Sequence, residues 1–343
     1  MPDSPPTAPD LSRRLRLSGA LPRGAVSELR AEHQVETETS TLNFLTATYT
    51  PDAPAGLPRR LVVKSPRAAH GGDIFAREVE FYRLLAPALG GAPTVRCLAA
   101  VEEGDAGAVV LEDLRATHEH PPWPLPPSRA RCELALDALA RLHARWWESP
   151  ELGRGVGQLH TPEGLSKMVR GIAEQLPAFL DAHGDALNAE ARRVYERVFG
   201  SGLLPWTRLA ESRALTVTHG DAHAGNFLFP RAGEGPAFLI DWQLWHLDLG
   251  ARDLAFLMAL HWYPSRRREL EPALLRFYHE RLLAHGVGGY PFDELRADYR
   301  RCVVRNLTVP LILWGRGTKP EGWWHRLECA LAAYRDLDCE ELL

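Results

Sequence analysis

A short polar run, HGDAHAGN from His219 to Asn226, concentrates side chains that can do chemistry. Apolar residues flank it, Ala214–Val217 before it and Phe227–Phe229 after it, so the run is predicted to be a loop held between two strands. Asp221 can accept a proton, and Asn226 can offer an oxygen to a hard metal ion. An ordinary turn with capping side chains is the alternative, and the rest of the chain must decide between the two.

Asp241 is predicted to lie near Asn226 because a β-hairpin joins them. The apolar runs Phe227–Phe229 and Ala237–Ile240 flank a short Gly-containing segment, which is the pattern of two strands and a turn. Such a hairpin returns the chain close to its start. Mg²⁺ prefers oxygen ligands and is usually held by one or two carboxylates together with substrate phosphates. Asn226 and Asp241, beside the base-like Asp221, therefore predict a magnesium–phosphate site.

The N-terminal part of the chain supplies two further groups that phosphoryl transfer needs. Lys64 ends a β-rich run, and Glu78 lies on a helix predicted over residues 73–89. In kinases a Lys at such a strand end contacts the α- and β-phosphates, and a Glu on the next helix holds it. The same template uses an Asp and an Asn in D-x-x-x-x-N spacing as base and magnesium ligand. Glu80 is the competing partner for Lys64.

The hinge between the two parts of the chain is predicted at VLEDL, where a buried strand over residues 106–114 ends in two acids. The backbone of Glu112 and Leu114 is expected to hydrogen-bond the adenine of a nucleotide. Five parts of a phosphoryl-transfer site thus occur in the expected order, and a chance occurrence of the full set would be rare.

Together these motifs resemble the phosphotransferase superfamily of aminoglycoside phosphotransferases and choline-kinase-like or ecdysteroid-kinase-like enzymes. HGDAHAGN resembles its His-Gly-Asp-x-His-x-x-Asn loop, and LIDWQ, from Leu239 to Gln243, resembles its metal-binding segment. FAREVEFY, VLEDL and LARLHARWW resemble its helix, hinge and first large-lobe helix. Gln243 and the Glu-Asp-Leu hinge are closest to the ecdysteroid-kinase-like branch. The resemblance extends from residue 26 to residue 340.

The resemblance implies an α+β, bilobal protein-kinase-like fold, with a small β-rich N-terminal lobe and a larger, mainly helical C-terminal lobe. It implies ATP-dependent phosphorylation of a small-molecule hydroxyl, with MgATP bound between the lobes. Carried to this sequence, it implies Asp221 as catalytic base, Asn226 and Asp241 as magnesium ligands, and Lys64 with Glu78 as the phosphate clamp.

The N-terminal nucleotide-binding lobe is predicted to be residues 1–115, and the C-terminal catalytic and acceptor-binding lobe residues 116–343. The first lobe starts with a Pro-rich stretch over 1–10 that is expected to be frayed, and strand-forming runs follow at Val26–Gln34, Leu42–Tyr49 and Leu61–Lys64. The second lobe is helical apart from a β-rich island over 214–241. Its helical patterns cover 129–147, 161–199, 249–262, 265–285, 292–314 and 322–337.

Composition narrows the classes of partner and compartment. The net charge of −4 gives no general attraction to nucleic acid. No apolar run approaches the roughly 18 residues of a membrane span, and the start MPDSPPTAPD lacks the features of a signal peptide. The five cysteines are scattered and never form Cys-x-x-Cys, which argues against structural zinc and a disulfide framework. We therefore expect a cytoplasmic protein whose partner is a small-molecule alcohol, with no indication of its oligomeric state.

One expected element departs from the kinase pattern. The loop between the first two strands reads TETSTLN, with Ser and Thr where a phosphate-binding loop usually has Gly. Hydroxyl and backbone N–H groups can still meet phosphates, but Glu36 and Glu38 would repel them if they pointed inward. The contacts of this loop therefore stay open, as does the choice between ATP and GTP.

The acceptor stays open as well. Asp241 is followed by Trp-Gln rather than Phe-Gly, and no Ala-Pro-Glu follows, so a small molecule is favoured over a protein. Most of the aromatic residues after the hairpin are expected to pack in the core, and the alternative is an aromatic pocket for a quaternary amine or an apolar alcohol. These residues are Trp242, Trp245, Trp262, Tyr263, Trp314, Trp323 and Trp324. An aminoglycoside would need several converging acids, and these could be Asp248, Glu321, Asp336, Asp338, Glu340 and Glu341. Antibiotic phosphorylation and a nucleotide-binding module without turnover are the alternatives to a general small-molecule kinase.

Overall fold

The computed structural model describes residues 5–67, 72–102, 107–122, 125, 127–211, 213–232 and 234–343, with the backbone alone for Gly72, Asp73 and Leu204. Its contacts divide the chain into two compact units. The first unit combines Met1–Pro121 with Asn226–Trp245, and the second combines Pro122–Gly225 with His246–Leu343.

A five-stranded antiparallel sheet forms the body of the first unit, in the order β1-β2-β3-β5-β4. The strands are β1 (Val26–Glu36), β2 (Ser40–Tyr49), β3 (Arg60–Pro66), β4 (Cys97–Val101) and β5 (Ala108–Glu112). The three strands predicted from β-forming runs are present, and β4 adds a strand at the edge of the sheet. The predicted start of β5, Ala106, lies outside the described residues. In this register Lys64 pairs with Leu42 on one side and with Val109 on the other.

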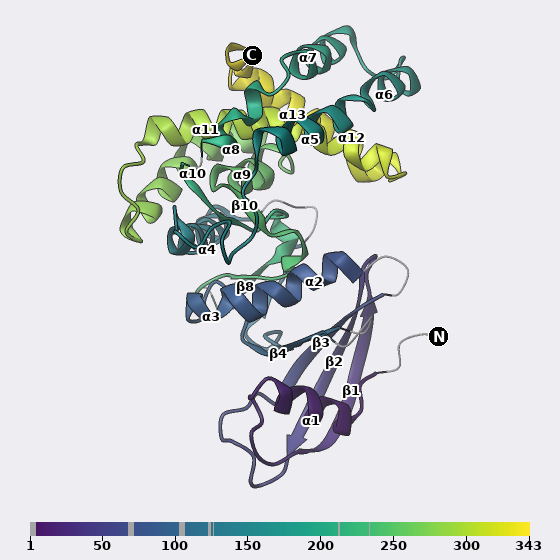
Figure 1. The fold of residues 1–343 in the computed structure, drawn as a ribbon, viewed down its shortest axis with the longest axis vertical. Helices are drawn as coiled ribbons and strands as arrows, with labels where there is room; N and C mark the ends of the chain where they lie inside the picture. The colour runs from purple at the N-terminus through teal and green to yellow at the C-terminus, as the bar shows by residue number, and fades with distance from the viewer. Residues whose placement is uncertain are drawn as a thin grey trace. The chain divides into compact units, whose positions relative to one another are not determined.

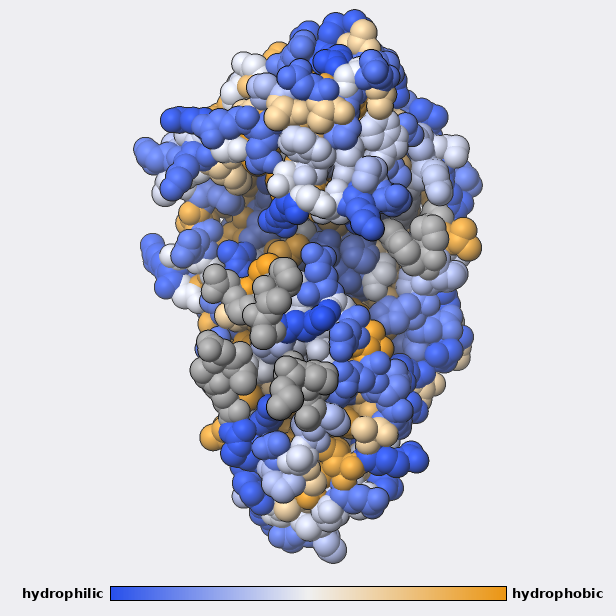
Figure 2. All heavy atoms as spheres, turned by 90° about the vertical axis from the view of Figure 1, so that its right-hand side faces the viewer, coloured by the Kyte–Doolittle hydropathy of each residue, from blue (hydrophilic) through white to orange (hydrophobic). Residues whose placement is uncertain are grey.

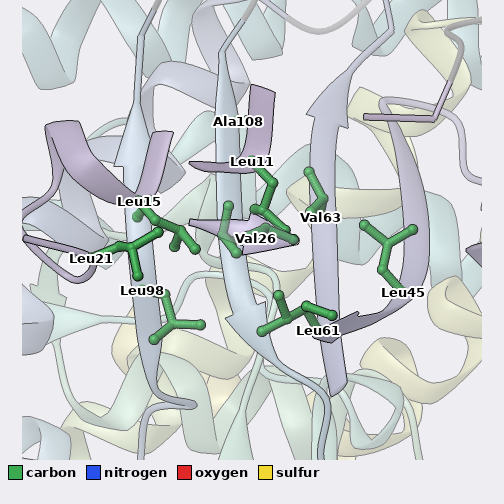
Figure 3. Packing of buried hydrophobic residues seen from close by; sticks show 12 residues of the cluster. Leu11, Leu15, Leu21, Val26, Leu45, Leu61, Val63, Leu98 and Ala108 are labelled. Atoms are coloured by element: carbon green, nitrogen blue, oxygen red, sulfur yellow. The ribbon is translucent and has the colours of Figure 1, made fainter. Parts of the chain in front are cut away.

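Side chains of β3 alternate between the two faces of the sheet. Leu61 and Val63 lie in a buried cluster with Leu11 and Leu15 of α1 (Ala8–Leu17), which Figure 3 shows from close by. The expectation of a frayed start is therefore wrong for Ala8–Asp10, since this segment begins a capped helix that buries its apolar face on the sheet. Thr7 caps it through the capping box with Asp10. Residues 1–4 lie outside the described residues.

The opposite face of the sheet, to which Lys64 points, is covered by the helix predicted over 73–89. It consists of α2 (Gly72–Glu80), a π-helical turn η1 (Phe81–Leu85) and α3 (Ala86–Leu89). α2 packs on β3, β4 and β5 (Figure 1). This packing brings the inner side of α2 over Lys64, which lies within β3 because the strand continues to Pro66, two residues beyond the predicted end.

The β-hairpin that leads to Asp241, the predicted metal ligand, belongs to the first unit. β8 (Phe227–Pro230) pairs with β9 (Phe238–Leu239) in the register Phe227 to Leu239, and with β6 (His118–Glu119). A bridge between Thr94 and Leu239 ties it to the segment before β4. The structural division thus differs from the predicted lobes 1–115 and 116–343, because backbone pairing attaches residues 226–245 to the N-terminal segment.

The second unit is mainly helical (Figure 1). α4 (Arg129–Trp146) packs against α10 (Pro264–Ala284), and β7 (Leu215–Thr218) pairs antiparallel with β10 (His246–Leu249). The pattern over 161–199 is interrupted twice, because the chain turns before Pro177 and again before the Asn188 cap. The other elements are α5 (Pro162–Ala173), α6 (Leu176–Ala182), α7 (Ala189–Gly200), η2 (Leu204–Trp206), α8 (Thr207–Ala210), α9 (Ala251–Leu254), η5 (Ala255–Ala259), α11 (Phe292–Asn306), α12 (Thr308–Gly315), α13 (Pro320–Asp336) and η6 (Cys339–Leu342).

Surface polarity is that of an ordinary globular chain. On the face drawn in Figure 2 hydrophilic side chains predominate, and apolar ones are scattered in small groups. None of the helices in the described ranges is long and apolar enough to cross a lipid bilayer.

Helix α1 offers a test of its place in the core. Leu15 is fully buried, whereas Leu17 on the same helix is 65% exposed. We expect Leu15→Ala to lower the free energy of unfolding by about 2–5 kcal/mol, because it leaves a cavity between helix and sheet. Leu17→Ala should change it by less than about 0.5 kcal/mol. Urea unfolding of both variants measures the difference, and equal small effects would mean that α1 is not part of the core.

Candidate active site

Lys64 lies at the centre of a buried ionic cluster in the first unit. Its Nζ is 2.6 Å from Oε2 of Glu78 on α2, and it donates a hydrogen bond of 2.7 Å to Oδ1 of Asp241. Glu78 and Lys64 are buried, whereas the Asp241 side chain is 41% exposed. The structure therefore brings three of the predicted site residues together. Between the two candidate partners on α2, Glu78 rather than Glu80 faces Lys64.

The charges of this cluster compensate one another away from water. Burial alone would lower the pKa of Lys64, but the carboxylates of Glu78 and Asp241 outweigh burial and raise the pKa above its ordinary value. Burial raises the pKa of Glu78, and the Lys64 ammonium opposes this only in part. Removing one partner of a buried ion pair costs about 3–5 kcal/mol, since it leaves an uncompensated charge. The ammonium is thus held charged at a fixed position.

Asn226 and Asp241 lie at the same end of the β8–β9 hairpin. The Ile240 N–H donates to the Asn226 carbonyl at 3.0 Å, one step beyond the Phe227–Leu239 pair. Lys64 occupies one of the two Asp241 carboxylate oxygens. No group of three or more His, Cys, Asp or Glu that could enclose a metal ion occurs in the part of the chain that the structure describes. One carboxylate and one carboxamide fit Mg²⁺, which usually completes its shell with phosphate oxygens and water.

Asp241 is held in an unusual backbone conformation by the residues that follow it. Its φ and ψ are both 66°, in the left-handed region, which costs a non-glycine residue of order 1–3 kcal/mol. The buried ring of Trp242 stacks on Phe81 at a centroid distance of 3.7 Å, and the Trp245 Nε1–H donates to the carbonyl of Arg77 at 2.8 Å. Both tryptophans are therefore core residues, as expected, and they fasten the Asp241 segment to α2 and η1.

The loop between β1 and β2 is held by Gln243, two residues after Asp241. The Thr39 hydroxyl donates to Gln243 Oε1 at 3.0 Å, and Gln243 Nε2 donates to the Ser40 hydroxyl at 2.9 Å. Gln243 and Ser40 are buried. Both ends of one side-chain amide thus connect the Asp241 segment to the loop where a phosphate-binding loop was expected.

The acids of that loop do not form an inward-facing pair. Glu36 makes a salt bridge of 3.3 Å with Arg67, and Glu38 is exposed. Arg67 also donates to the Thr37 carbonyl at 2.7 Å. The repulsion of phosphate considered for Glu36 is therefore reduced by a neighbouring cation.

Two backbone groups of the hinge residues already form hydrogen bonds within the first unit. The Glu112 N–H donates to the Arg96 carbonyl at 3.0 Å, and the Leu114 carbonyl accepts from Thr117 N–H at 2.9 Å and His118 N–H at 2.8 Å. Groups that could meet a nucleotide base are then the Glu112 carbonyl and the Leu114 N–H.

Asp221 belongs to the second unit, five residues before Asn226 along the chain, and η3 (Ala224–Asn226) lies between them. Its own N–H donates to Nδ1 of the buried His219 at 3.3 Å, so His219 orders the loop as predicted. The Asp221 carboxylate is 28% exposed and lies 3.6 Å from Nε2 of His223. This carboxylate is thus accessible and fixed through its backbone.

The carboxylate of Asp253, on α9, accepts two hydrogen bonds from the backbone of the loop before Asp221. Its Oδ2 accepts from the His219 N–H at 2.7 Å, and its Oδ1 accepts from the Gly220 N–H at 3.0 Å. His143 of α4 lies 3.1 Å from the same carboxylate and 2.8 Å from the Tyr278 hydroxyl. Burial alone would raise the pKa of Asp253, but the His143 hydrogen bond and the neighbouring imidazoles lower it. Asp253 therefore stays ionised as an acceptor for the loop backbone.

Glycine is required where this network meets β10. A side chain at Gly250 would bring its Cβ to 2.7 Å from the Tyr278 hydroxyl and 2.9 Å from Nδ1 of His143. The missing side chain leaves room for the Tyr278 hydroxyl to meet His143, whose other ring nitrogen contacts Asp253. No local pattern in the sequence predicts that Gln243, Asp253 and His143 hold these loops, because each contact joins residues that lie far apart along the chain.

Comparison with known proteins gives the family. Residues 29–292 match the model of the phosphotransferase enzyme family. Because the match covers more than half of the chain, the chain belongs to this family and is a phosphotransferase. A search of the curated proteins finds no match.

Solved structures of similar fold have low sequence identity to the chain. The GDP complex of aminoglycoside 2'-phosphotransferase-IIIa is 15% identical, with a TM-score of 0.57 over 95% of this chain and 98% of that one. Choline kinase from Cryptosporidium parvum is 11% identical, with a TM-score of 0.56 over 92% of each chain. A microcompartment-associated aminopropanol kinase is 14% identical, with a TM-score of 0.55 over 91% of each. The predicted superfamily and the α+β, protein-kinase-like fold are confirmed.

Gln243 gives a test of how the loop between β1 and β2 is fixed. Gln243→Ala removes two buried hydrogen bonds, each worth about 0.5–1.5 kcal/mol, and we expect faster amide hydrogen exchange over Thr37–Ser40. Gln34→Ala, an exposed glutamine on β1, is the matched control and should leave this exchange unchanged. If both variants exchange like the parent chain in mass spectrometry, Gln243 does not restrain the loop.

Proposed function

We propose that the chain transfers the γ-phosphoryl group of ATP to a hydroxyl of a small molecule. The observation that carries the proposal is the buried Lys64 ammonium, directed by Glu78 and Asp241. A cation fixed between two carboxylates suits the α- and β-phosphates of a nucleotide. Membership of the phosphotransferase family supports this, and the GDP complex of a structurally similar enzyme is consistent with a nucleotide donor.

In this proposal each residue has a distinct role. Lys64, held by Glu78, binds the α- and β-phosphates. Asn226 and Asp241 would hold Mg²⁺, which when bound neutralises charge on the phosphates. Asp221 orients the acceptor hydroxyl and takes its proton as the new O–P bond forms and the bond from the γ-phosphorus to the bridging oxygen breaks. ADP leaves, and the proton passes from Asp221 to solvent.

The nucleotide base would be bound by the hinge backbone. The Glu112 carbonyl can accept from the adenine amino group, and the Leu114 N–H can donate to a ring nitrogen of the base. Their neighbours, the Glu112 N–H and the Leu114 carbonyl, are engaged within the protein. An acceptor–donor pair of this kind suits adenine, and initial rates with ATP and GTP at equal concentration would compare the two donors.

A small acceptor is supported by the chain after Asp241. α9 begins at Ala251, and residues 242–250 between them are largely occupied by η4 (Trp242–Leu244) and β10. No length is left there for a segment that binds a peptide. The five cysteines are all free, which supports a reducing compartment such as the cytoplasm.

Asp221→Asn tests the proposed base. Because the amide cannot take the acceptor proton, we expect phosphoryl transfer and slow Mg²⁺-dependent ATP hydrolysis to fall by about 10²- to 10⁴-fold. Asp181→Asn, an exposed aspartate of α6, is the control and should keep the parent rate. ADP release is measured with and without amino alcohols, hydroxy acids, aminoglycosides, macrolides and sterols. Parent-level rates in Asp221→Asn would contradict the assignment. A protein that binds ATP without any turnover would be a nucleotide-binding module instead.

Glu78→Gln tests the phosphate clamp. Without the carboxylate Lys64 loses one of its two anionic partners, and we expect kcat/KM for ATP to fall by at least about tenfold, the equivalent of one charged hydrogen bond. The matched variant Glu80→Gln, two residues along the same helix, should stay within about twofold, since surface charge changes are small. Steady-state kinetics measure both. Equal losses in the two variants would show that Glu78 has no special role.

A further inference from the structure

The acids that were candidates for binding a polycationic acceptor are largely occupied. Four of the six are held in salt bridges with arginines of the second unit. These pairs are Asp248 with Arg305, Asp336 with Arg267 and Arg268, Glu340 with Arg197, and Glu341 with Arg300. Asp248 is fully buried, and two hydrogen bonds join it to Arg305. Both carboxylate oxygens of Asp248 and of Asp336 are bonded to arginine, so a cationic amine would have to displace an arginine from these two acids.

Four of the tryptophans do not supply a cage for a quaternary amine either. Trp242 and Trp245 are buried against Phe81 and Arg77 in the first unit. In the second unit Trp262 and Trp323 are also buried, with 2% and 0% exposure. A cation–π site needs an open aromatic face, and these four rings do not present one.

The charged side chain of Arg326, on α13, differs from these acids in its pairing. Its Nε is buried without a hydrogen-bond partner, and its guanidinium makes no salt bridge within the described part of the chain. Asp221 is the carboxylate that acts on it electrostatically. Burial lowers the pKa of Arg326, and the Asp221 charge opposes this. Arg326 is half-buried and in no salt bridge with the described residues, so its guanidinium could bind an anion through charged hydrogen bonds.

Two histidines and a phenylalanine form a further group beside Asp221 in the second unit. His223 is 3.6 Å from the Asp221 carboxylate, and its ring centroid is 5.6 Å from that of His261. The ring centroids of His261 and Phe256 are 4.8 Å apart, and the Nδ1 of His261 lies 2.7 Å from the Phe256 carbonyl oxygen. α13, which carries Arg326, packs on η5, the segment that contains Phe256. Burial lowers the pKa of His261 well below its ordinary value, so Arg326 is the charged group of this set and the two imidazoles and Phe256 contribute rings.

We propose that the acceptor of this enzyme carries an anionic oxygen group, a carboxylate or a phosphate monoester, and that Arg326 binds it while Asp221 receives the hydroxyl proton. The inference rests on the proposed function, since it names the acceptor class of the same reaction. Arginine suits both groups, because its planar fork forms two parallel charged hydrogen bonds with either. Hydroxy acids and phosphorylated alcohols are thus favoured over amino alcohols and aminoglycosides.

The test compares acceptors that differ only in charge. For chains of two to six carbons, we would measure ADP release from MgATP with the hydroxycarboxylate, the phosphate monoester of the diol, the neutral diol and the amino alcohol. Each compound is also tested as an inhibitor of the slow ATP hydrolysis. We expect an anionic series to act at about 10- to 100-fold lower concentration than the amino alcohols, the range of a charged hydrogen-bond pair. The two anionic series distinguish carboxylate from phosphate.

Variants of Arg326 connect this preference to the residue. Arg326→Gln should remove the advantage of the anionic series, and Arg326→Lys should retain part of it. The control is Arg335→Gln on the same helix, nine residues and about 13.5 Å further along, where an exposed arginine pairs with Glu190. Slow ATP hydrolysis and thermal unfolding show whether each variant is folded and binds nucleotide.

The outcomes separate the two proposals. Transfer to an amino alcohol at lower concentration than to any anion would leave the phosphotransferase function intact and overturn the acceptor class. The same holds if no series acts while ATP hydrolysis continues, or if Arg326→Gln keeps the anionic preference. If the parent chain shows neither phosphoryl transfer nor Asp221-dependent ATP hydrolysis, the proposed function is contradicted instead.

Discussion

The buried ammonium of Lys64, shared between Glu78 and Asp241, is the interaction on which the first unit depends. It joins the central strand β3, the helix α2 and the segment after β9 through one charge. Because Lys64 and Glu78 would each be a costly buried charge without a partner, their contacts hold the three elements together. Asp241 is then the member that remains accessible, which gives the cluster one face toward a ligand.

Each unit also fixes its functional loop with a buried polar side chain from elsewhere. In the first unit, the amide of Gln243 holds Thr39 and Ser40. In the second, Asp253 accepts from the backbone of the loop before Asp221, and His143 orients it. Buried polar groups must be satisfied by hydrogen bonds, so these contacts restrict each loop to few conformations. Such restriction suits phosphoryl transfer, where catalysis is mostly positioning and electrostatic stabilisation.

The charged side chains of the second unit bear on whether the acceptor is a cation or an anion. Carboxylates that could have bound a cationic substrate are paired with the chain's own arginines, and those pairs contribute to the packing of α10, α11 and α13. Arg326 has no such pair in the described residues. A shared fold does not fix the ligand of a site, so we expect the acceptor to depend on charged residues of this kind.

The sequence by itself determined the parts of the site that depend on local spacing. The strand bearing Lys64, the helix bearing Glu78 and the hairpin that returns from Asn226 to Asp241 follow from short-range periodicity and turn chemistry. Only the tertiary structure decided that α1 belongs to the core and which acids are already paired. It also decided that Gln243 contacts Ser40 and Thr39, which precede it in the chain by 203 and 204 positions. Long-range contacts of this kind leave no periodic pattern, since they depend on which faces the folded chain brings together.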